Sequence, residues 1–175
     1  MKFTIYQSSR QGGRKNNQDR VAYSYSREAL LMVVADGMGG HMHGEIAAQI
    51  AVQTLTDQFQ KMAKPRLDNP MEFLATTITH AHFAINDYAV EQNLLEIPHT
   101  TIVAAVVQDN TAYWAHVGDS RLYLFSDGSL LARTEDHTAV AKLVRDGIIS
   151  EEEAGHHPER NKVSNCLGGY VPPQV

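Results

Sequence analysis

The sequence is short of cysteine, of long apolar runs and of clustered basic residues. The single cysteine, Cys166, excludes an internal disulfide framework and favours a reducing compartment. No stretch approaches about 18 consecutive apolar residues, and the N-terminus has no apolar segment of signal-peptide length, so we predict a cytoplasmic protein that does not enter a membrane. Lysine and arginine form no runs and the formal net charge is -5, which argues against nucleic acid as the main partner.

The 175 residues, 43 % of them hydrophobic, are enough for one domain with its own core. Strand-like segments come first, two long amphipathic helices follow over 45–63 and 70–89, and short strands then return. Asn69, Pro70 and Glu72 form the pattern of a capping box at the start of the second helix. This order of elements predicts an α+β domain rather than alternating βαβ units.

Seven segments have the composition or alternation of strands, and they are 3–7, 21–26, 30–35, 100–108, 111–118, 121–126 and 129–133. The last four are rich in β-branched and aromatic residues and are separated by turn signals, so we predict that they form an antiparallel meander. Residues 136–165 predict only short helices. We expect them to form a mobile cover of low local stability over the body of the domain.

The stretch 30–45 is the most informative part of the chain. Its first five residues are all apolar and predict a strand buried on both faces, which presents Asp36 at its end. The glycines that follow, Gly37 first among them, allow a sharp turn and a close approach of a ligand to the backbone. An ordinary tight turn is the alternative. A dinucleotide-binding loop is disfavoured because Met42 stands where a third small residue is needed.

Three aspartates, Asp19, Asp36 and Asp119, occupy loop or strand-end positions with polar or glycine neighbours. Carboxylates of this kind, together with an exposed glycine carbonyl, suit Mg²⁺ or Mn²⁺ better than softer metals. Two such ions about 4 Å apart can share a water molecule and activate it for attack on phosphorus. Taken singly, each aspartate could equally be a turn residue. His80 and His82 point in different directions on their helix and cannot share a metal.

Five segments follow one another along nearly the whole chain: RKNNQDR (14–20), VVADGMGGHMHGE (33–45), TTIVAAVV (100–107), AHVGDSRLYLF (115–125) and the segment 135–161. Together they resemble the PPM family of metal-dependent Ser/Thr protein phosphatases, also called type 2C, and its bacterial branch in particular. The resemblance implies a four-layer α-β-β-α sandwich of antiparallel sheets flanked by helices, incomplete at the C-terminus. It also implies a single domain over 1–175 with a flap subdomain at about 136–165.

The resemblance further implies which residues hold the metals. Asp19, Asp36 and the carbonyl of Gly37 would bind the first ions, with Asp36 bridging two of them, and Asp119 would help to bind a third, weaker ion. The cofactors are then two or three Mg²⁺ or Mn²⁺ ions. A water molecule that bridges the metals would attack the phosphorus, and no covalent phosphoenzyme is expected.

Two further residues take catalytic roles by the same resemblance. Arg14 would clamp the substrate phosphate, because a guanidinium offers two parallel donors to two phosphate oxygens. His41 would protonate the departing serine or threonine oxygen, since an imidazole can hold a proton near neutral pH. Alone, Arg14 would be interpreted as a solvated loop charge, and His43 is interpreted as a bystander.

The chain departs from the family's pattern at its end. Family members continue with strands that carry an Asp-Gly-Leu element and a late Asp-Asn, whereas this sequence stops at Val175 before either one. Either the chain is a fragment of a longer protein, which we favour, or the isolated chain binds metal poorly.

We therefore predict a metal-dependent phosphatase that hydrolyses phosphoserine and phosphothreonine in proteins. Its partners would be phosphorylated proteins and an opposing Ser/Thr kinase, with neither nucleic acid nor a membrane among them. The alternative is a catalytically inactive phosphatase-like module that binds a partner, or an inactive fragment of a longer enzyme. The site residues named above favour the enzyme, and the missing C-terminal acids favour the alternative. A metal-dependent nuclease or other phosphodiesterase is disfavoured by the absence of a basic groove and of stacking aromatics.

Overall fold

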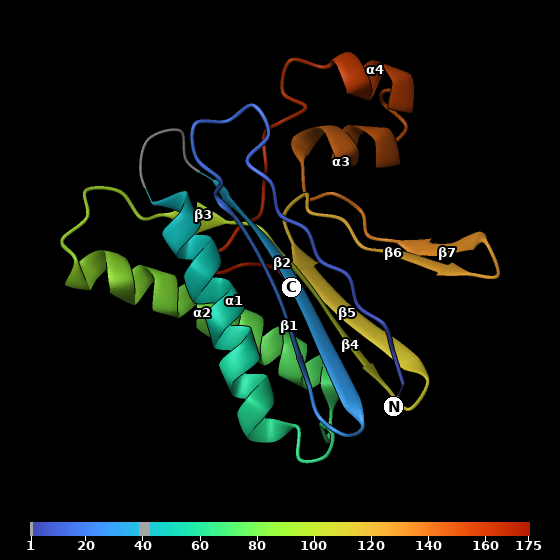
Figure 1. Ribbon diagram of the computed structural model, residues 1–175. Helices are drawn as coiled ribbons and strands as arrows, with labels where there is room; N and C mark the ends of the chain where they lie inside the picture. The colour runs from blue at the N-terminus through green and yellow to red at the C-terminus, as the bar shows by residue number, and fades with distance from the viewer. Residues whose placement is uncertain (1, 39–42) are drawn as a thin grey trace.

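The computed structural model describes residues 2–38 and 43–175, which fold into helices on one face of an antiparallel sheet (Figure 1). The sheet runs in the order β1 (Asp19–Tyr25), β2 (Ala29–Met38), β4 (Ile102–Gln108) and β5 (Thr111–Val117). A short fifth strand, β3 (His99–Thr100), pairs with the end of β2. The predicted α+β class with antiparallel sheets is confirmed.

Two long helices, α1 (Gly44–Met62) and α2 (Pro70–Glu91), cover one face of this sheet (Figure 1). The start of α2 follows the prediction, because Asn69 Oδ1 accepts a hydrogen bond from the backbone N–H of Glu72 at 3.2 Å. The Glu72 carboxylate accepts from the Asn69 side-chain amide at 3.2 Å, whereas a complete capping box would use the Asn69 backbone N–H, so the predicted box is only half formed. The cap therefore satisfies one free N–H group of the first turn.

The hydrophobic core lies between these helices and the sheet. Small residues of α1, among them Ala47 and Ala51, are fully buried and let the helix pack closely on the strands. Phe59 and Phe73 meet edge to face with ring centroids 6.1 Å apart where the two helices cross. Strand β2 packs against α1 and lies between β1 and β4 in the sheet.

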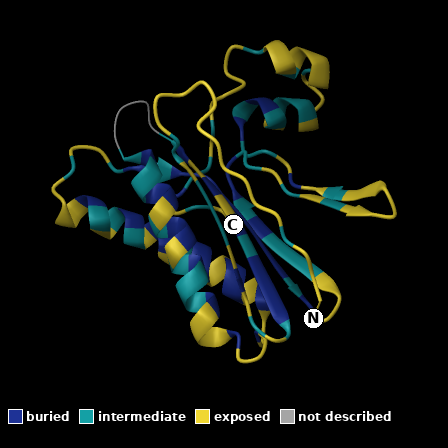
Figure 2. Ribbon diagram, in the orientation of Figure 1, coloured by how far each residue is buried: buried dark blue, intermediate teal, exposed yellow. Residues whose placement is uncertain are grey.

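Strand β2 alternates between two environments, so the prediction of a strand buried on both faces is wrong. Leu31, Val33 and Ala35 point into the core and are at most 1 % exposed. Val34 belongs to the other face and is 42 % exposed. That face carries no helix among the described residues, which explains the difference (Figure 2). Asp36 has the same parity as Val34 and therefore belongs to the open face.

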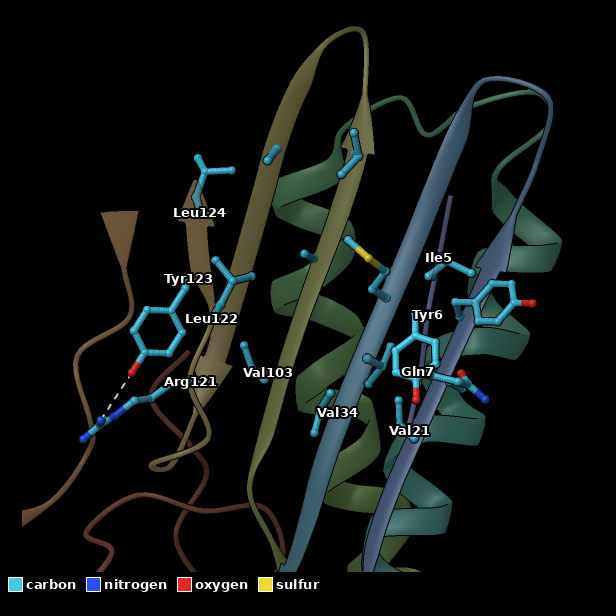
Figure 3. A pocket seen from close by; sticks show the side chains of 17 residues that line it. Ile5, Tyr6, Gln7, Val21, Val34, Val103, Arg121, Leu122, Tyr123 and Leu124 are labelled. Carbon is cyan, nitrogen blue, oxygen red and sulfur yellow. Dashed lines mark hydrogen bonds between the residues drawn. The ribbon is translucent and has the colours of Figure 1, made fainter. Parts of the chain in front are cut away.

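The open face contains an apolar cavity of about 330 Å³ (Figure 3). Figure 3 shows Ile5 and Tyr6 of the N-terminal segment over β1, with Leu122 and Leu124 across the cavity. The segment 3–7 has no strand pairing, so the prediction of a strand there is wrong: its apolar residues lie against the sheet without joining a strand edge. None of the predicted site residues that the structure describes lines this cavity.

The predicted four-strand meander is also wrong. β4 and β5 form one hairpin within the main sheet, whereas β6 (Tyr123–Ser126) and β7 (Ser129–Arg133) form a separate two-stranded sheet (Figure 1). The chain leaves the main sheet after Val117, where β5 ends. Within the described ranges there are two sheets, the main sheet and the β6–β7 hairpin, and α1 and α2 form one helical layer.

The segment after β7 contains the two short helices that were predicted, α3 (Ala139–Arg145) and α4 (Glu151–His156). Thr138 caps α3, and Ser150 with Glu153 forms a complete capping box on α4. No residue of α4 is buried (Figure 2). The low stability of this cover stays a prediction. No helix in the part of the chain described here is long and apolar enough to cross a bilayer.

Candidate metal centre

Asp19 and Asp36 lie directly opposite each other on adjacent strands. Asp19 begins β1 and Asp36 lies near the end of β2, and the antiparallel register pairs them across the ladder. Paired residues of neighbouring strands direct their side chains to the same face, with Cβ atoms about 5 Å apart. The two carboxylates that the sequence places 17 positions apart are therefore neighbours.

The backbone around Asp36 differs from the predicted glycine turn. β2 continues through Gly37 to Met38, because these residues pair with Thr100 and His99 of β3. Gly37 is nevertheless required as glycine. A Cβ at this position would lie 2.3 Å from the carbonyl oxygen of Gly44 and 2.8 Å from that of Gln18. The close approach brings the start of α1 and the loop before β1 against the acidic strand end.

Asp119 reaches the same end of the sheet from the turn after β5. Its neighbour Gly118 has φ of +108°, and a Cβ there would lie 2.6 Å from the Thr101 methyl group. Its other neighbour, Ser120, is joined to Thr101 by a 2.6 Å contact between the two hydroxyl oxygens. Thr101 also contacts Asp36, so it links the two acids. The prediction did not single out Thr101, because a threonine before a strand reads as an ordinary β-branched residue.

One cleft of about 860 Å³ brings the predicted residues together. Arg14, Asp19, Asp36, Gly37 and Asp119 all line it. The cleft is also lined by residues without a predicted role, and these are Arg10, Gln11, Lys15, Asn16, Asn17, Gln18, Met38, His43, Glu45, Asn161 and Val163. In Figure 1 the loop before β1, the end of β2 and the segment that carries α3 and α4 gather at this end of the sheet. His41 lies outside the described residues.

The electrostatics of the cleft favour a cation. The pKa of Asp36 is raised from 3.8 to about 6, first by partial removal from water and then by the Asp19 carboxylate, with a smaller effect from Asp119. The Arg14 guanidinium acts in the opposite direction. Carboxylates that repel one another in this way are stabilised when a positive ion enters between them.

The donor set fits Mg²⁺ or Mn²⁺ ions bound by few protein ligands. Within 2–38 and 43–175, no three His, Cys, Asp or Glu side chains are grouped closely enough to form a ligand cage for one ion. Asp19 and Asp36 form a pair, and Asp119 stands apart on its own turn. Mg²⁺ commonly binds through one or two carboxylates and keeps several waters, so a pair of carboxylates with glycine carbonyl oxygen is a suitable set.

Arg121 and Asp136 connect the turn of Asp119 to the cover segment. The guanidinium donates to both carboxylate oxygens, at 2.7 and 2.6 Å, and also to the Tyr123 hydroxyl at 3.4 Å (Figure 3 shows the latter). A bidentate pair of this kind fixes orientation as well as distance. It joins the segment after β5 to the segment just before α3.

His137 makes the second connection. Its Nδ1 accepts from the backbone N–H of Gly118 at 3.2 Å and from Asn165 Nδ2 at 3.0 Å, so this nitrogen carries no proton. The ring stacks on His116 with centroids 4.3 Å apart. Burial and the neighbouring His116 lower the pKa of His137, against the opposing charges of Glu135 and Asp136.

A pH dependence of the cover follows from this contact. A histidine whose pKa is lower in the folded than in the unfolded protein contributes stability that is complete above the ordinary pKa of 6.5 and is lost as the pH falls through the folded value. We expect amide hydrogen exchange of 137–165, corrected for intrinsic rates, to accelerate as the pH falls below 6.5. The measurement compares wild type with His137→Phe, and His156→Gln on α4 serves as the matched control. Equal pH dependence in wild type and His137→Phe would contradict the assignment.

The comparisons with known proteins identify the family of this chain. The family model described as "Protein phosphatase 2C" matches residues 7–156. A putative protein phosphatase 2C-type of Streptococcus pyogenes serotype M6 is 35 % identical over 160 residues, which cover 91 % of this chain and 65 % of that protein. The chain therefore belongs to the protein phosphatase 2C family.

Solved structures of serine/threonine phosphatases also match this chain. The serine/threonine phosphatase of S. agalactiae matches with a TM-score of 0.80 and 31 % identity, over 92 % of this chain and 66 % of that one. The catalytic domain of the serine/threonine protein phosphatase PstP, solved with two manganese ions, matches with a TM-score of 0.68 and 33 % identity, over 83 % of this chain and 64 % of that one. The chain thus spans about two thirds of the length of these relatives.

Proposed function

We propose that this chain is the metal-binding part of a phosphatase that hydrolyses phosphoserine and phosphothreonine in proteins. The observation that carries the proposal is the direct pairing of Asp19 and Asp36 at the wall of one cleft. Membership of the protein phosphatase 2C family and the similarity to a manganese-bound phosphatase structure support it.

Each residue has a defined task in this proposal. Asp19, Asp36 and the carbonyl of Gly37 hold Mg²⁺ or Mn²⁺, and Asp119 holds a weaker ion. When bound, such ions supply Lewis-acid activation of water and neutralise charge on the phosphate. The Asp36 carboxylate must be ionised to serve as a ligand, and its pKa of about 6 allows this at neutral pH.

The substrate side of the cleft is assigned to two cationic groups. Arg14 lines the cleft and is close enough to Asp36 to influence its pKa, so we assign it to orienting the phosphate by paired N–H donors. His41 is assigned to donating the proton that the departing serine or threonine oxygen requires. It lies outside the described residues, and its role rests on the resemblance alone.

The biological setting is proposed on the same basis. Phosphorylated proteins are the substrates, and a Ser/Thr kinase in the same cell opposes the reaction. The chain acts as one domain with the segment 136–165 as a flap beside the cleft. A cytoplasmic location is in keeping with Cys166, which is half-buried and has no disulfide partner.

The test of this function is hydrolysis of a phosphoserine peptide by the purified chain, with Mn²⁺ and after chelation. We expect release of phosphate that requires Mn²⁺ and is lost in Asp19→Asn. The matched control is Asp68→Asn, which changes an aspartate outside the cleft. Binding of the peptide without any hydrolysis would favour the inactive binding module, and hydrolysis that is equal with and without metal would contradict the proposal.

A further inference from the structure

Thr101 lies between the end of β2, which carries Asp36, and the turn after β5, which carries Asp119, and its side chain contacts both segments. It is fully buried, with 0 % exposure. Its Oγ1 is 3.1 Å from the backbone nitrogen of Asp36 and 2.6 Å from Ser120 Oγ. Its backbone N–H donates to the carbonyl oxygen of Asp36 at 2.9 Å. One residue therefore holds the peptide of one proposed metal ligand and the direct neighbour of another.

The direction of the hydrogen bond to Asp36 follows from the donors available. The Asp36 backbone N–H can only donate, so Thr101 Oγ1 is the acceptor of that bond. The Thr101 hydroxyl still has a proton and a second lone pair for its contact with Ser120 Oγ, in which either hydroxyl can be the donor. These two hydrogen bonds require a hydroxyl at position 101, because a valine of the same shape can neither accept nor donate a hydrogen bond.

The packing of the Thr101 methyl group constrains the same turn. The Thr101 methyl group fills the space beside Gly118, where an added Cβ would lie 2.6 Å from it. Gly118 and Ser120 flank Asp119, so the same side chain contacts the residue before Asp119 and the residue after it. The turn that carries Asp119 therefore has little freedom to move relative to Asp36.

We propose that Thr101 is a positioning residue that fixes Asp119 relative to Asp36 and thereby sets the affinity of the cleft for divalent cations. This inference rests on the proposed function, because it takes the two aspartates as metal ligands. Thr101 itself touches no ion. Its hydroxyl determines how closely the Asp119 carboxylate approaches the Asp19 and Asp36 pair, in the way that outer hydrogen bonds orient the ligands of other metal sites.

The experiment is a titration of the metal-free chain with Mn²⁺, followed by isothermal calorimetry or by the electron paramagnetic resonance signal of free Mn²⁺. We expect Thr101→Val to weaken binding about tenfold, the size of effect typical for loss of a residue that orients a ligand. Thr101→Ser keeps the hydroxyl and should restore most of the affinity. Thr79→Val is the matched control, since the Thr79 hydroxyl bonds to the Ala75 carbonyl on the exposed side of α2.

Ser120→Ala removes the same hydrogen bond from the more exposed partner and keeps the test valid if Thr101→Val does not fold. We expect Ser120→Ala to weaken the part of Mn²⁺ binding that depends on Asp119. The double variant should bind Mn²⁺ no more weakly than Thr101→Val alone, because Thr101→Val already removes the contact with Ser120. A purely structural bond would lower the thermal unfolding temperature of both variants and leave Mn²⁺ affinity at the wild-type value, which would overturn the inference.

Asp36→Asn separates this inference from the proposed function. If Asp36→Asn loses Mn²⁺ binding while Thr101→Val and Ser120→Ala retain wild-type affinity, the metal site stands and the role of Thr101 is refuted. If Asp36→Asn binds Mn²⁺ as well as wild type does, the metal site itself is refuted. Loss of affinity in all three variants, with Thr79→Val unchanged, supports both.

Discussion

Replacing Asp36 by asparagine is expected to lower Mn²⁺-dependent phosphatase activity by a factor on the order of 10³, since a bound metal contributes several kcal/mol of transition-state stabilisation. The same change should make the metal-free protein more stable. In the folded protein the pKa of Asp36 is raised from 3.8 to about 6, so its ionised form is disfavoured there. Activity and stability are therefore expected to change in opposite directions.

The pH window of the stability effect follows from the direction of the shift. A carboxyl whose pKa is raised on folding costs no stability below its unfolded value, costs progressively more as the pH rises from 3.8 to about 6, and costs the full amount above that. At neutral pH we expect Asp36→Asn to raise the free energy of unfolding by about 1 kcal/mol, after allowance for solvent screening of a partly exposed carboxylate.

Chemical denaturation in the presence of a chelator measures this effect, and Asp57→Asn on the outer side of α1 is the control. The gain of Asp36→Asn over wild type should vanish when the measurement is repeated at a pH below the unfolded pKa. An Asp36→Asn protein that is less stable than wild type at neutral pH would show that neither burial nor the neighbouring acids disfavour the ionised Asp36, and the electrostatic description of the cleft would be wrong.

Replacing Gly37 by alanine is expected to destabilise the protein by about 3 kcal/mol or more and to abolish metal binding, since overpacking against backbone has no flexible group to yield. The added Cβ would lie 2.3 Å from Gly44 oxygen and 2.4 Å from Gly44 carbon. Relief requires a shift of the start of α1 or of the strand end that presents Asp36. Either movement separates the start of α1 from the end of β2, and both of these segments line the cleft.

Gly13→Ala provides the matched control for this change. Gly13 lies in the loop before β1, and a Cβ there would meet nothing within 4 Å. We expect it to leave the unfolding midpoint and Mn²⁺ affinity close to wild type. If Gly37→Ala unfolds at the same denaturant concentration as Gly13→Ala, the close approach of β2 and α1 is not a constraint on the fold.

The position of the acids could be predicted from the sequence because short-range signals determined it. The apolar run before Asp36 and the polar loop before Asp19 located a strand end and a strand start, and antiparallel pairing then joined them. The helix cap at Asn69 is similarly local. A helix cap of this kind depends on residues only three or four positions apart.

Features that depend on distant partners could not be predicted in this way. The alternating segment 3–7 has a strand's period, but the period does not supply a neighbouring edge, and none pairs with it in the described structure. The hairpin of β6 and β7 is separate from the main sheet, and the segment before it is held by Arg121 and Asp136, a contact between residues 15 positions apart. The role of Thr101 depends on Ser120 in the same way.

The most direct test of the central claim is an anomalous difference map from crystals of this chain grown with Mn²⁺. We predict density for manganese between the carboxylates of Asp19 and Asp36, about 2.1 Å from at least one oxygen of each. A weaker peak should lie beside Asp119. Manganese density that is absent from this pair of aspartates, at a Mn²⁺ concentration that supports hydrolysis of the phosphopeptide, would contradict the account.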